Sequence, residues 1–442
     1  MRALLIWPTG MKSDDWMLFP LALGYLRNAV DCDILDCSIE DIDNAEIARR
    51  CSGYDLVGIT VWGFNVHNVQ DIIDRIRACC DAKIVVGGPS AGLVKADYAL
   101  LGEAEENFAA LVARIGTPPS AQLDAIPGLG IGAGRAPQMP EVFSDDLDAL
   151  GVVDYDALRL ADYHRKGYKY WLYTLKDKFV TAPLMATRGC PYKCTFCAAP
   201  ALQGIKLRKH SIAYVMDTIE TLCFKYGVRQ ISFLDDNLTL DARWAKRLCE
   251  EIIRFKERHN IELVCATSNG VRYKTLDLEL LKLMRRAGWG EIVLAPESGS
   301  ARTLTRMRKE LDLDVVDEKV ELVHRAGMNT VAFFIVGYPG ETPEDLQESR
   351  KYILNSKFDR AIVNLFNPIP GTPVYFELLE AGEIEPQEIK INYRSVEALQ
   401  YVTPGLTREA LSRFQRDVLE KTTFREMWLK DLPLAEVSAR RG

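Results

Sequence analysis

The most informative stretch of the chain is Arg188-Gly-Cys190-Pro-Tyr-Lys-Cys194-Thr-Phe-Cys197, which places three cysteines on one short segment. It follows the apolar run Pro183 to Thr187, which predicts a β-strand, so the cysteines lie on the loop after that strand. Soft thiolates favour iron-sulfur clusters and zinc, and three of them can bind three corners of a cubane while the fourth iron stays open. We therefore expect Cys190, Cys194 and Cys197 to be metal ligands.

Two other uses of these cysteines stay open on the residues alone. A structural zinc site would need a fourth ligand, and no Cys or His follows closely, since His210 is the next one. A thioredoxin-like redox pair is possible in principle but needs no third cysteine. The other cysteines lack ligand-like spacing. Cys249 and Cys265 fit apolar runs typical of a core, and those near the N-terminus are scattered.

The second half of the chain, from Thr181, alternates predicted strands and helices. The predicted strands are short apolar runs: Pro183 to Thr187, Gln230 to Leu234, Glu262 to Thr267, Glu291 to Leu294, Thr330 to Val336 and Ala361 to Phe366. Thr342 can cap one of the helices, with Pro343 at its first position and Asp345 at its third. The pattern predicts a partial (β/α)6 barrel over residues 179–372, with chemistry at the carboxyl ends of its strands, and a small helical region over 373–442.

The first part of the chain predicts a doubly wound, Rossmann-like α/β domain over residues 1–116. Its predicted strands are Ala3 to Trp7, Asp33 to Leu35, Leu56 to Val61 and Lys83 to Val86, with helices at Leu21 to Val30, Ala45 to Cys51 and Val69 to Cys79. Ligands of such sheets bind beyond the carboxyl ends of the strands. Residues 117–178 lose this periodicity and predict a linker. Its aromatic side chains should pack over the domains: Tyr163, Tyr168, Tyr170, Trp171 and Tyr173.

The cysteine spacing, with aromatic Phe196 before the last cysteine and a position after the first barrel strand, resembles the radical S-adenosylmethionine (SAM) superfamily. The resemblance implies a [4Fe-4S] cluster whose open iron binds the amino and carboxylate groups of SAM. The reduced cluster then cleaves the sulfonium to a 5'-deoxyadenosyl radical. Segments at later strand ends resemble the same superfamily. They imply that SAM is bound by Phe196, Asp235, Asp236, Ser268, Asn269, Arg272, Glu297, Ser298, Gly337 and Pro339. Asp235, Asp236 or Asn237 could instead cap the following helix.

Residues 1–116 resemble the N-terminal cobalamin-binding domain of one subgroup of this superfamily. The resemblance rests on segments that end predicted strands and implies cobalamin contacts from Thr60, Trp62, Gly87, Gly88, Pro89, Gly102 and Glu103. The Asp-x-His-x-x-Gly segment of many cobalamin domains is missing, since residues 7–19 hold no histidine. Trp62 and Phe64 are therefore candidates to pack beneath the corrin. The alternative is a degenerate domain without ligand, because glycine-rich loops are common to doubly wound folds.

The resemblance implies a cobalamin-dependent radical SAM methyltransferase of natural product biosynthesis, which methylates an unactivated carbon of a small molecule. One SAM would methylate cob(I)alamin, a second would give the radical, and methylcobalamin would supply the methyl group. One alternative keeps the cofactors but catalyses cyclisation, ring contraction or oxidation. An RNA methylthiotransferase is another, although the chain has no second cluster motif and no basic tail. The last alternative is a binding protein in which the cluster has only a structural role. The residues identify no catalytic acid or base.

The charge and composition of the chain limit which partners and which location we expect for it. The formal net charge of -7 gives no general attraction to phosphate backbones, so nucleic acid is not expected. No apolar run is long enough for a membrane span, and Ala3 to Trp7 is too short for a signal peptide. Cysteines in an unexported chain are more often thiols or metal ligands than disulfides. We expect a cytoplasmic enzyme that receives electrons from a donor such as flavodoxin or ferredoxin.

Overall fold

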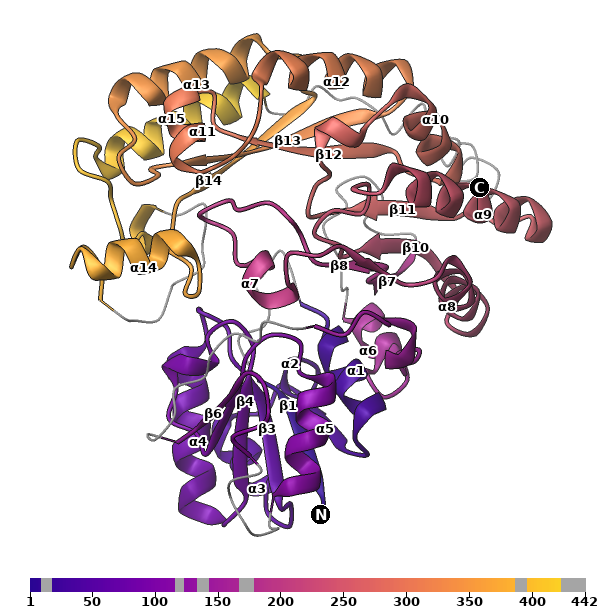
Figure 1. Ribbon diagram of the computed structural model, residues 1–442, viewed down its shortest axis with the longest axis vertical. Coiled ribbons are helices and arrows are strands. Elements are labelled where there is room, and N and C mark those ends of the chain that lie inside the picture. Colours follow the sequence, from indigo (N-terminus) through magenta and orange to yellow (C-terminus); the bar gives the residue numbers. More distant parts are fainter. Residues whose placement is uncertain (9–17, 116–122, 133–142, 167–178, 386–395, 423–442) are drawn as a thin grey trace.

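The computed structural model describes residues 1–8, 18–115, 123–132, 143–166, 179–385 and 396–422. Two α/β units follow one another along the chain, and Figure 1 shows the N-terminal unit below the barrel-like unit. The short helix α7 (Ala199–Gln203), which directly follows the cysteine segment, lies at the level where the two units meet (Figure 1). This architecture confirms the predicted fold class.

The N-terminal unit is built on a six-stranded sheet with the order β2-β1-β3-β4-β5-β6. All neighbours pair parallel except β6, which runs antiparallel to β5. Its strands are β1 (Ala3–Trp7), β2 (Asp33–Asp36), β3 (Leu56–Thr60), β4 (Lys83–Gly87), β5 (Tyr98–Leu100) and β6 (Leu129–Ile131). Its helices are α1 (Leu21–Ala29), α2 (Cys37–Glu40), α3 (Asn44–Arg50), α4 (Val66–Cys79) and α5 (Glu105–Arg114).

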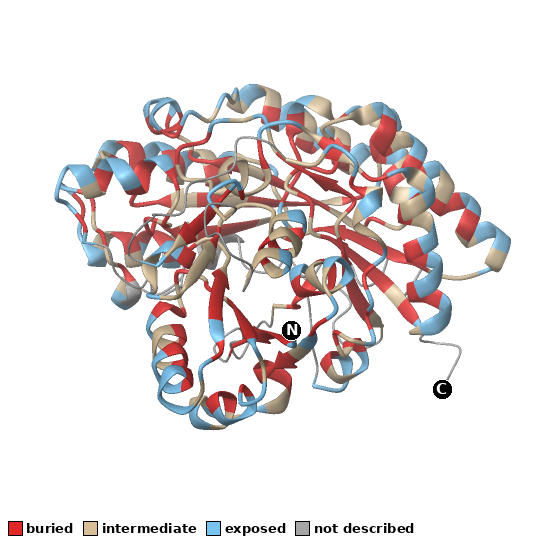
Figure 2. Ribbon diagram, turned by 60° about the horizontal axis from the view of Figure 1, so that its bottom comes forward, coloured by how far each residue is buried: buried red, intermediate tan, exposed pale blue. Residues whose placement is uncertain are grey.

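Alternate residues of β1 pack into two hydrophobic cores, one on each face of the sheet. Leu5 and Trp7 pack in one, whereas Leu4 and Ile6 pack in the other, and all four are buried. Successive side chains of a strand point to opposite faces, so a strand covered on both sides must be apolar at every position. Figure 2 shows the result: strands are buried along their length, and exposed residues gather on the outer faces of the helices.

The four strands predicted in this unit are confirmed, with small shifts at their ends. Two further strands, β5 and β6, were not predicted, because three-residue strands at a sheet edge are too short to show periodicity. β6 falls inside the 117–178 segment that the sequence predicts as a linker.

The barrel-like unit contains two three-stranded parallel sheets. The strands are β7 (Val180–Leu184), β10 (Val228–Phe233) and β11 (Val264–Thr267), then β12 (Glu291–Glu297), β13 (Asn329–Val336) and β14 (Arg360–Leu365). A parallel bridge between Cys265 and Trp289 joins the sheets. The six strands therefore follow one another as in the predicted open barrel. The covering helices are α8 (Ile212–Lys225), α9 (Ala242–His259), α10 (Leu278–Ala287), α11 (Ala301–Arg306), α12 (Leu313–Arg325) and α13 (Pro343–Asn355).

The described part of the linker packs against both units, as predicted. The Tyr155 hydroxyl donates to the Pro183 carbonyl at 2.7 Å, and the Tyr163 hydroxyl donates to Asp36 Oδ2 at 2.7 Å. Tyr163 lies in the short helix α6 (Leu160–Arg165) and is fully buried. The other four aromatic residues of this prediction, Tyr168, Tyr170, Trp171 and Tyr173, lie outside the described residues.

The C-terminal region is helical where it is described, with α14 (Pro373–Glu380) and α15 (Arg408–Thr422). α15 packs on the last barrel strand, where Gln415 Nε2 donates to the Val363 carbonyl at 3.2 Å. Within the described residues, no helix has both the length and the apolar character that crossing a membrane requires.

Thr342 caps α13 in the predicted way, and its hydroxyl accepts from the Asp345 amide while Asp345 accepts from the Thr342 amide at 2.8 Å. Thr342→Ala should lower the free energy of unfolding by about 1 kcal/mol, the usual loss for a helix cap. Thr342→Ser keeps the hydroxyl and should stay close to the original protein. Urea denaturation with hydrogen exchange of the first α13 amides measures both. Equal destabilisation by Ala and Ser would contradict a capping role for the hydroxyl.

Candidate active site

The cysteine segment, residues 189–198, has little regular structure of its own and is fixed by bonds to distant parts of the barrel. We call it the cluster loop. The Thr195 amide donates to the Met307 carbonyl at 3.0 Å, and the Thr195 carbonyl accepts from the Val374 amide at 3.0 Å. The Thr195 hydroxyl lies 2.6 Å from the hydroxyl of Tyr338, just beyond β13. The loop that begins after the first barrel strand is therefore tied to the far side of the barrel.

Of the three cysteines of the cluster loop, Cys194 is buried, whereas Cys190 and Cys197 are half-buried. Burial raises the pKa of all three, and that of Cys197 reaches about 12. A buried thiolate needs positive charge beside it, which bound iron supplies. Among the described residues, no three Cys, His, Asp or Glu side chains converge as ligands of one metal ion would. This geometry offers no mononuclear zinc site at the loop, whereas the corners of a cubane are spaced farther apart.

The cysteines open into a cavity of about 450 Å³ at the carboxyl ends of the strands. Of the predicted site residues, the cavity wall contains Cys190, Cys194, Cys197, Phe196, Asp236, Ser268, Asn269, Arg272 and Glu297. The loops after β8 (Thr187–Arg188), β10, β11 and β12 all contribute to this wall. The structure thus brings together residues that lie more than a hundred positions apart in the chain.

Two neighbouring carboxylates after β10 have different environments. Asp235 is 2% exposed and accepts from the Ala186 amide at 3.2 Å, so it ties the end of β10 to the chain before the cluster loop. Asp236 lines the cavity, and its Oδ2 atom is buried without a hydrogen-bond partner among the described residues. Burial raises the pKa of Asp235 to about 7 and that of Asp236 to about 6. Neither caps a helix in the structure: that role belongs to Asp241, which accepts from the Trp244 amide of α9.

The loop after β11 contributes polar groups and a cation. Asn269 Nδ2 donates to the Leu234 carbonyl at 2.8 Å, and Ser268 Oγ lies 3.0 Å from Ser232 Oγ. The guanidinium of Arg272 lies 3.6 Å from the centre of the Tyr192 ring, between the first two cysteines of the cluster loop. This cation-π contact helps to hold the cluster loop against the cavity wall.

Glu297 is aimed into the cavity by an irregularity of β12. The register of β12 against β13 shifts between Leu294 and Glu297, and Glu297 adopts φ 68°, a left-handed conformation that is unfavourable for this residue type. Its Oε1 atom accepts from Lys309 Nζ at 2.9 Å, and both side chains are almost fully buried. Burial raises the pKa of Glu297, and Lys309 opposes that shift. Strain together with a buried ion pair is typical of a functional site.

Like Asp235, three further predicted residues do not line the cavity and are engaged elsewhere. Ser298 Oγ lies 3.0 Å from Ser349 Oγ, and the Gly337 amide donates to Glu341 Oε2 at 2.6 Å. The Pro339 carbonyl accepts from Arg306 Nε at 2.9 Å. Their neighbour Tyr338 holds the cluster loop, as described above. Their predicted contacts with SAM remain untested predictions.

Sequence reasoning missed several residues of the cavity wall, of which Lys309 is the most important. It lies in the mixed-charge run Arg306-Met-Arg-Lys309-Glu310, which reads as a solvated surface. Nothing in the sequence of that run indicates that its lysine is buried while its other charged residues are not. Tyr192, by contrast, has a usable signal, because it lies between two predicted ligands. The other residues that were missed are Ala199, Asn237, Gly270, Val271, Tyr273, Leu294, Ala295, Pro296, Leu311, Val316 and Phe333.

The carboxyl edge of the N-terminal sheet faces the barrel. The loop after β14 reaches the loop after β4, because a side chain at Gly371 would lie 4.0 Å from the Pro89 carbonyl. Gly88 has φ 102°, and a side chain there would lie 2.5 Å from the Val61 carbonyl. Only glycine allows this close approach, so the loops after β3 and β4 form one compact cradle beyond Thr60 and Gly87.

Two buried polar atoms in this cradle lack a hydrogen-bond partner among the described residues. They are Trp62 Nε1 and Ser90 Oγ, and Ser90 is 2% exposed. Unsatisfied buried donors are costly in a finished fold, and a ligand rich in amide groups would satisfy them. The residues present therefore fit a ligand with many hydrogen-bonding groups, such as cobalamin. Trp62 stacks on Phe64 with 6.1 Å between ring centres. Gly102 and Glu103 lie just after β5, and the Glu103 carboxylate is bound by Arg208 of the barrel-like unit.

Two sequence families match the chain in the order of its two α/β units. The B12 binding domain matches residues 20–112, and the Radical SAM superfamily matches residues 184–353. The chain therefore belongs to the radical SAM superfamily, among its members that carry an N-terminal B12-binding domain. It is an enzyme, and the two families point to SAM and cobalamin as its cofactors.

Relatives are similar over most of the chain. Cytidylyl-2-hydroxyethylphosphonate methyltransferase of Streptomyces wedmorensis is 27% identical over 441 residues, which cover 89% of this chain and 80% of that protein. An uncharacterised methyltransferase of Pyrococcus horikoshii is 26% identical over 377 residues, which cover 80% and 77%. The fold is similar to that of the radical SAM methyltransferase TsrM from Kitasatospora setae, solved with tryptophan substrate and a SAM analogue. That comparison gives a TM-score of 0.74 at 20% identity and covers 94% and 88% of the two chains.

Replacing a cysteine of the cluster loop should remove the cluster, whereas replacing a core cysteine should not. We predict that Cys194→Ala, purified anaerobically after reconstitution, loses most of the iron and the charge-transfer absorption of the cluster. Cys249→Ala is the matched control, because Cys249 is also buried but lies in the core under α9. Iron and sulfide analysis with absorption spectroscopy checks both. A Cys194→Ala protein with the same iron content as Cys249→Ala would contradict the assignment.

Proposed function

We propose that the chain is a cobalamin-dependent radical SAM methyltransferase that methylates an unactivated carbon of a small molecule. The observation that carries the proposal is the meeting of two carboxyl edges, one with the three-cysteine cavity and one with the cradle after β3 and β4. Two cofactors that must act on one substrate need such an arrangement. The methyltransferases that are similar to this chain support the same reaction.

The cavity supplies groups of both signs for SAM. Asp236 has a free carboxylate oxygen that can accept from the amino group, and Glu297 can accept from hydroxyls of the ribose. Lys309 and Arg272 place positive charge on the same wall, where it can balance a carboxylate. Phe196 and Phe333 provide apolar surface at the cavity and help to exclude water.

The cradle of the N-terminal unit would hold cobalamin through Thr60, Trp62, Gly87, Gly88 and Pro89. Bound cobalamin supplies a transferable methyl group, and the reduced cluster supplies the electron that cleaves SAM. Trp62 can lie against the corrin face, since residues 7–19 provide no histidine ligand. Its unsatisfied indole N–H can donate to an amide of the corrin periphery.

The substrate class in this proposal is a small molecule, by analogy with the tryptophan bound to TsrM. We propose a cytoplasmic location and an electron donor of the flavodoxin or ferredoxin type, because the cluster must be reduced before SAM is cleaved. Neither nucleic acid nor a membrane is needed as a partner.

The proposed reaction is tested with SAM carrying a deuterated methyl group. Reduced enzyme loaded with both cofactors is incubated with the labelled SAM and a small-molecule extract, and products are compared by mass spectrometry. We expect a product that carries the labelled methyl group and appears together with 5'-deoxyadenosine. If 5'-deoxyadenosine forms while the substrate-derived product stays unlabelled, the enzyme catalyses a rearrangement or an oxidation instead of methyl transfer.

The two aspartates after β10 should respond differently to loss of charge. Asp236→Asn should weaken SAM binding by about tenfold or more, because a charge-assisted hydrogen bond to the amino group is lost. Asp235→Asn should instead lower stability, since its carboxylate bonds to the backbone before the cluster loop. Equilibrium binding of SAM to the reconstituted enzyme and thermal unfolding measure the two effects. If Asp235→Asn weakens SAM binding as much as Asp236→Asn at equal cluster content, the assigned roles are wrong.

A further inference from the structure

The cluster loop begins in a two-stranded ribbon that carries two buried arginines. The ribbon pairs β8 (Thr187–Arg188) with β9 (Arg208–Lys209) antiparallel, and Arg188 lies directly opposite Arg208. The two side chains are only 5% and 2% exposed. Like charges opposite each other across a strand pair destabilise it, and burial increases that effect. The ribbon therefore needs carboxylates from elsewhere.

Both carboxylates come from the N-terminal unit. Glu103 binds Arg208 in a two-pronged arrangement, with Nη1 to Oε2 at 2.7 Å and Nη2 to Oε1. Glu105, at the start of α5, lies 2.8 Å from Arg188 Nη2, and Glu103 Oε1 lies 3.6 Å from Arg188 Nη1. The two acidic side chains are 12% and 10% exposed. Two buried positive charges of the barrel-like unit are thus matched by two buried negative charges of the N-terminal unit.

Further contacts fix the arginines at this interface. The Arg188 guanidinium lies 4.8 Å from the centre of the Tyr25 ring of α1, so it contacts two elements of the N-terminal unit. Arg208 also donates to the carbonyls of Ser144, at 2.7 Å, and Gln203, at 2.6 Å. Burial alone would lower the pKa of Arg188, but Glu105 and Glu103 raise it above its ordinary value. A guanidinium is not deprotonated in proteins, so both arginines need the carboxylates beside them.

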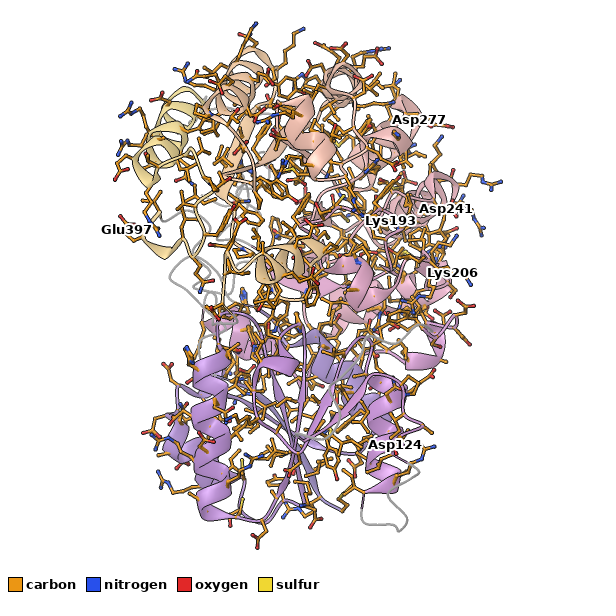
Figure 3. The ribbon with its side chains drawn as sticks, turned by 60° about the vertical axis from the view of Figure 1, so that its left-hand side comes forward. Asp124, Lys193, Lys206, Asp241, Asp277 and Glu397 are labelled. Carbon is orange, nitrogen blue, oxygen red and sulfur yellow. The ribbon has the colours of Figure 1, made fainter. Side chains whose placement is uncertain are left out.

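The ribbon leads directly into the first cluster ligand. Gly189 has φ 90°, and a side chain there would lie 2.2 Å from the Lys206 carbonyl, so the ribbon and the loop pack without space between them. The Cys190 amide donates to the Gly204 carbonyl at 3.0 Å. Lys206, labelled in Figure 3 near the level where the two units meet, pairs with Asp145 of the linker at 2.7 Å. A shift of the ribbon would therefore move Cys190.

We propose that Glu103 and Glu105 are positioning residues for the cluster: these carboxylates of the cobalamin-binding unit complete the ribbon that holds the cluster loop. Docking of the N-terminal unit and correct placement of the cluster are then one coupled event. The charge pairs add to the hydrophobic core that continues from the N-terminal unit into the barrel-like unit, and they act directly beside the cluster loop. The proposal rests on the assignment of the cluster to Cys190, Cys194 and Cys197, and it does not depend on methyl transfer.

The proposal is tested by the retention of iron in the full-length protein. Glu103→Gln keeps the size of the side chain but leaves the buried arginines with an excess positive charge. After anaerobic reconstitution, we expect it to lose cluster absorption to a chelator about tenfold faster than the original protein, since a partner of a buried ion pair is removed. Glu105→Gln is a second variant with the same expectation. Glu291→Gln is the matched control, because Glu291 is a buried partner of Arg360 within the barrel-like unit, 3.6 Å away.

The double variant Glu103→Gln/Arg208→Gln tests whether the unbalanced charge itself causes the loss of iron. It restores charge balance, and two amides can hydrogen-bond to each other, so iron loss should slow again relative to Glu103→Gln. Far-ultraviolet circular dichroism is measured on the same samples and should stay close to that of the original protein. Loss of iron at the original rate in both single variants, equal loss in Glu291→Gln, or no rescue by Arg208→Gln would overturn the proposal. Failure of the cluster assignment is distinguishable, because the unsubstituted protein would then hold no cluster after reconstitution.

Discussion

Three thiols of one short loop must be held in a buried place where they become thiolates, and the loop has little regular structure to hold them. The bonds of Thr195 meet this constraint, since its amide, carbonyl and hydroxyl reach Met307, Val374 and Tyr338 respectively. These partners follow α11, β13 and β14, so the loop after the first strand is closed against the last ones. The open barrel is thereby completed by hydrogen bonds to the loop that carries the ligands, and cluster binding and barrel geometry depend on each other.

The second constraint is that two cofactor sites must face one substrate. In a parallel sheet, the ligand-binding loops all follow the carboxyl ends of the strands. Two such sheets must therefore meet at these ends if their two ligand sites are to open into one space. Gly371 and Pro89 mark one point of this meeting, and Arg208 and Glu103 mark another. The first is a close approach of backbones and the second is a buried ion pair. Both contacts contribute to the placement of the two units, together with the hydrophobic core that the units share.

Most of the fold could be predicted from the sequence, because strands buried on both faces leave apolar runs that are easy to recognise, such as Lys83 to Val86. The three cysteines that we propose as cluster ligands stand out in the sequence by their spacing and by their position after the first barrel strand. Whether another residue lines the cavity depends on the direction of its side chain in the loop after a strand. The alternation of a strand ends before that loop, so the sequence pattern does not predict this direction. Asp235 and Asp236 are adjacent in sequence, yet only the second faces the cavity. The burial of Lys309 and the pairing of Glu103 with Arg208 depend on tertiary contacts between distant segments, which leave no local pattern.

The electrostatics of the cavity match the chemistry of SAM, the cosubstrate that we propose for it. SAM carries an amino group, a carboxylate and a sulfonium, so a wall of one sign would repel one end while attracting the other. The buried pair of Glu297 and Lys309 places both signs side by side at 2.9 Å, with Arg272 and Asp236 on the same wall. A buried pair adds little net stability to a fold, because desolvation offsets much of the attraction. The pair is nevertheless held by a strained Glu297 at φ 68°, which indicates that its position serves binding rather than folding.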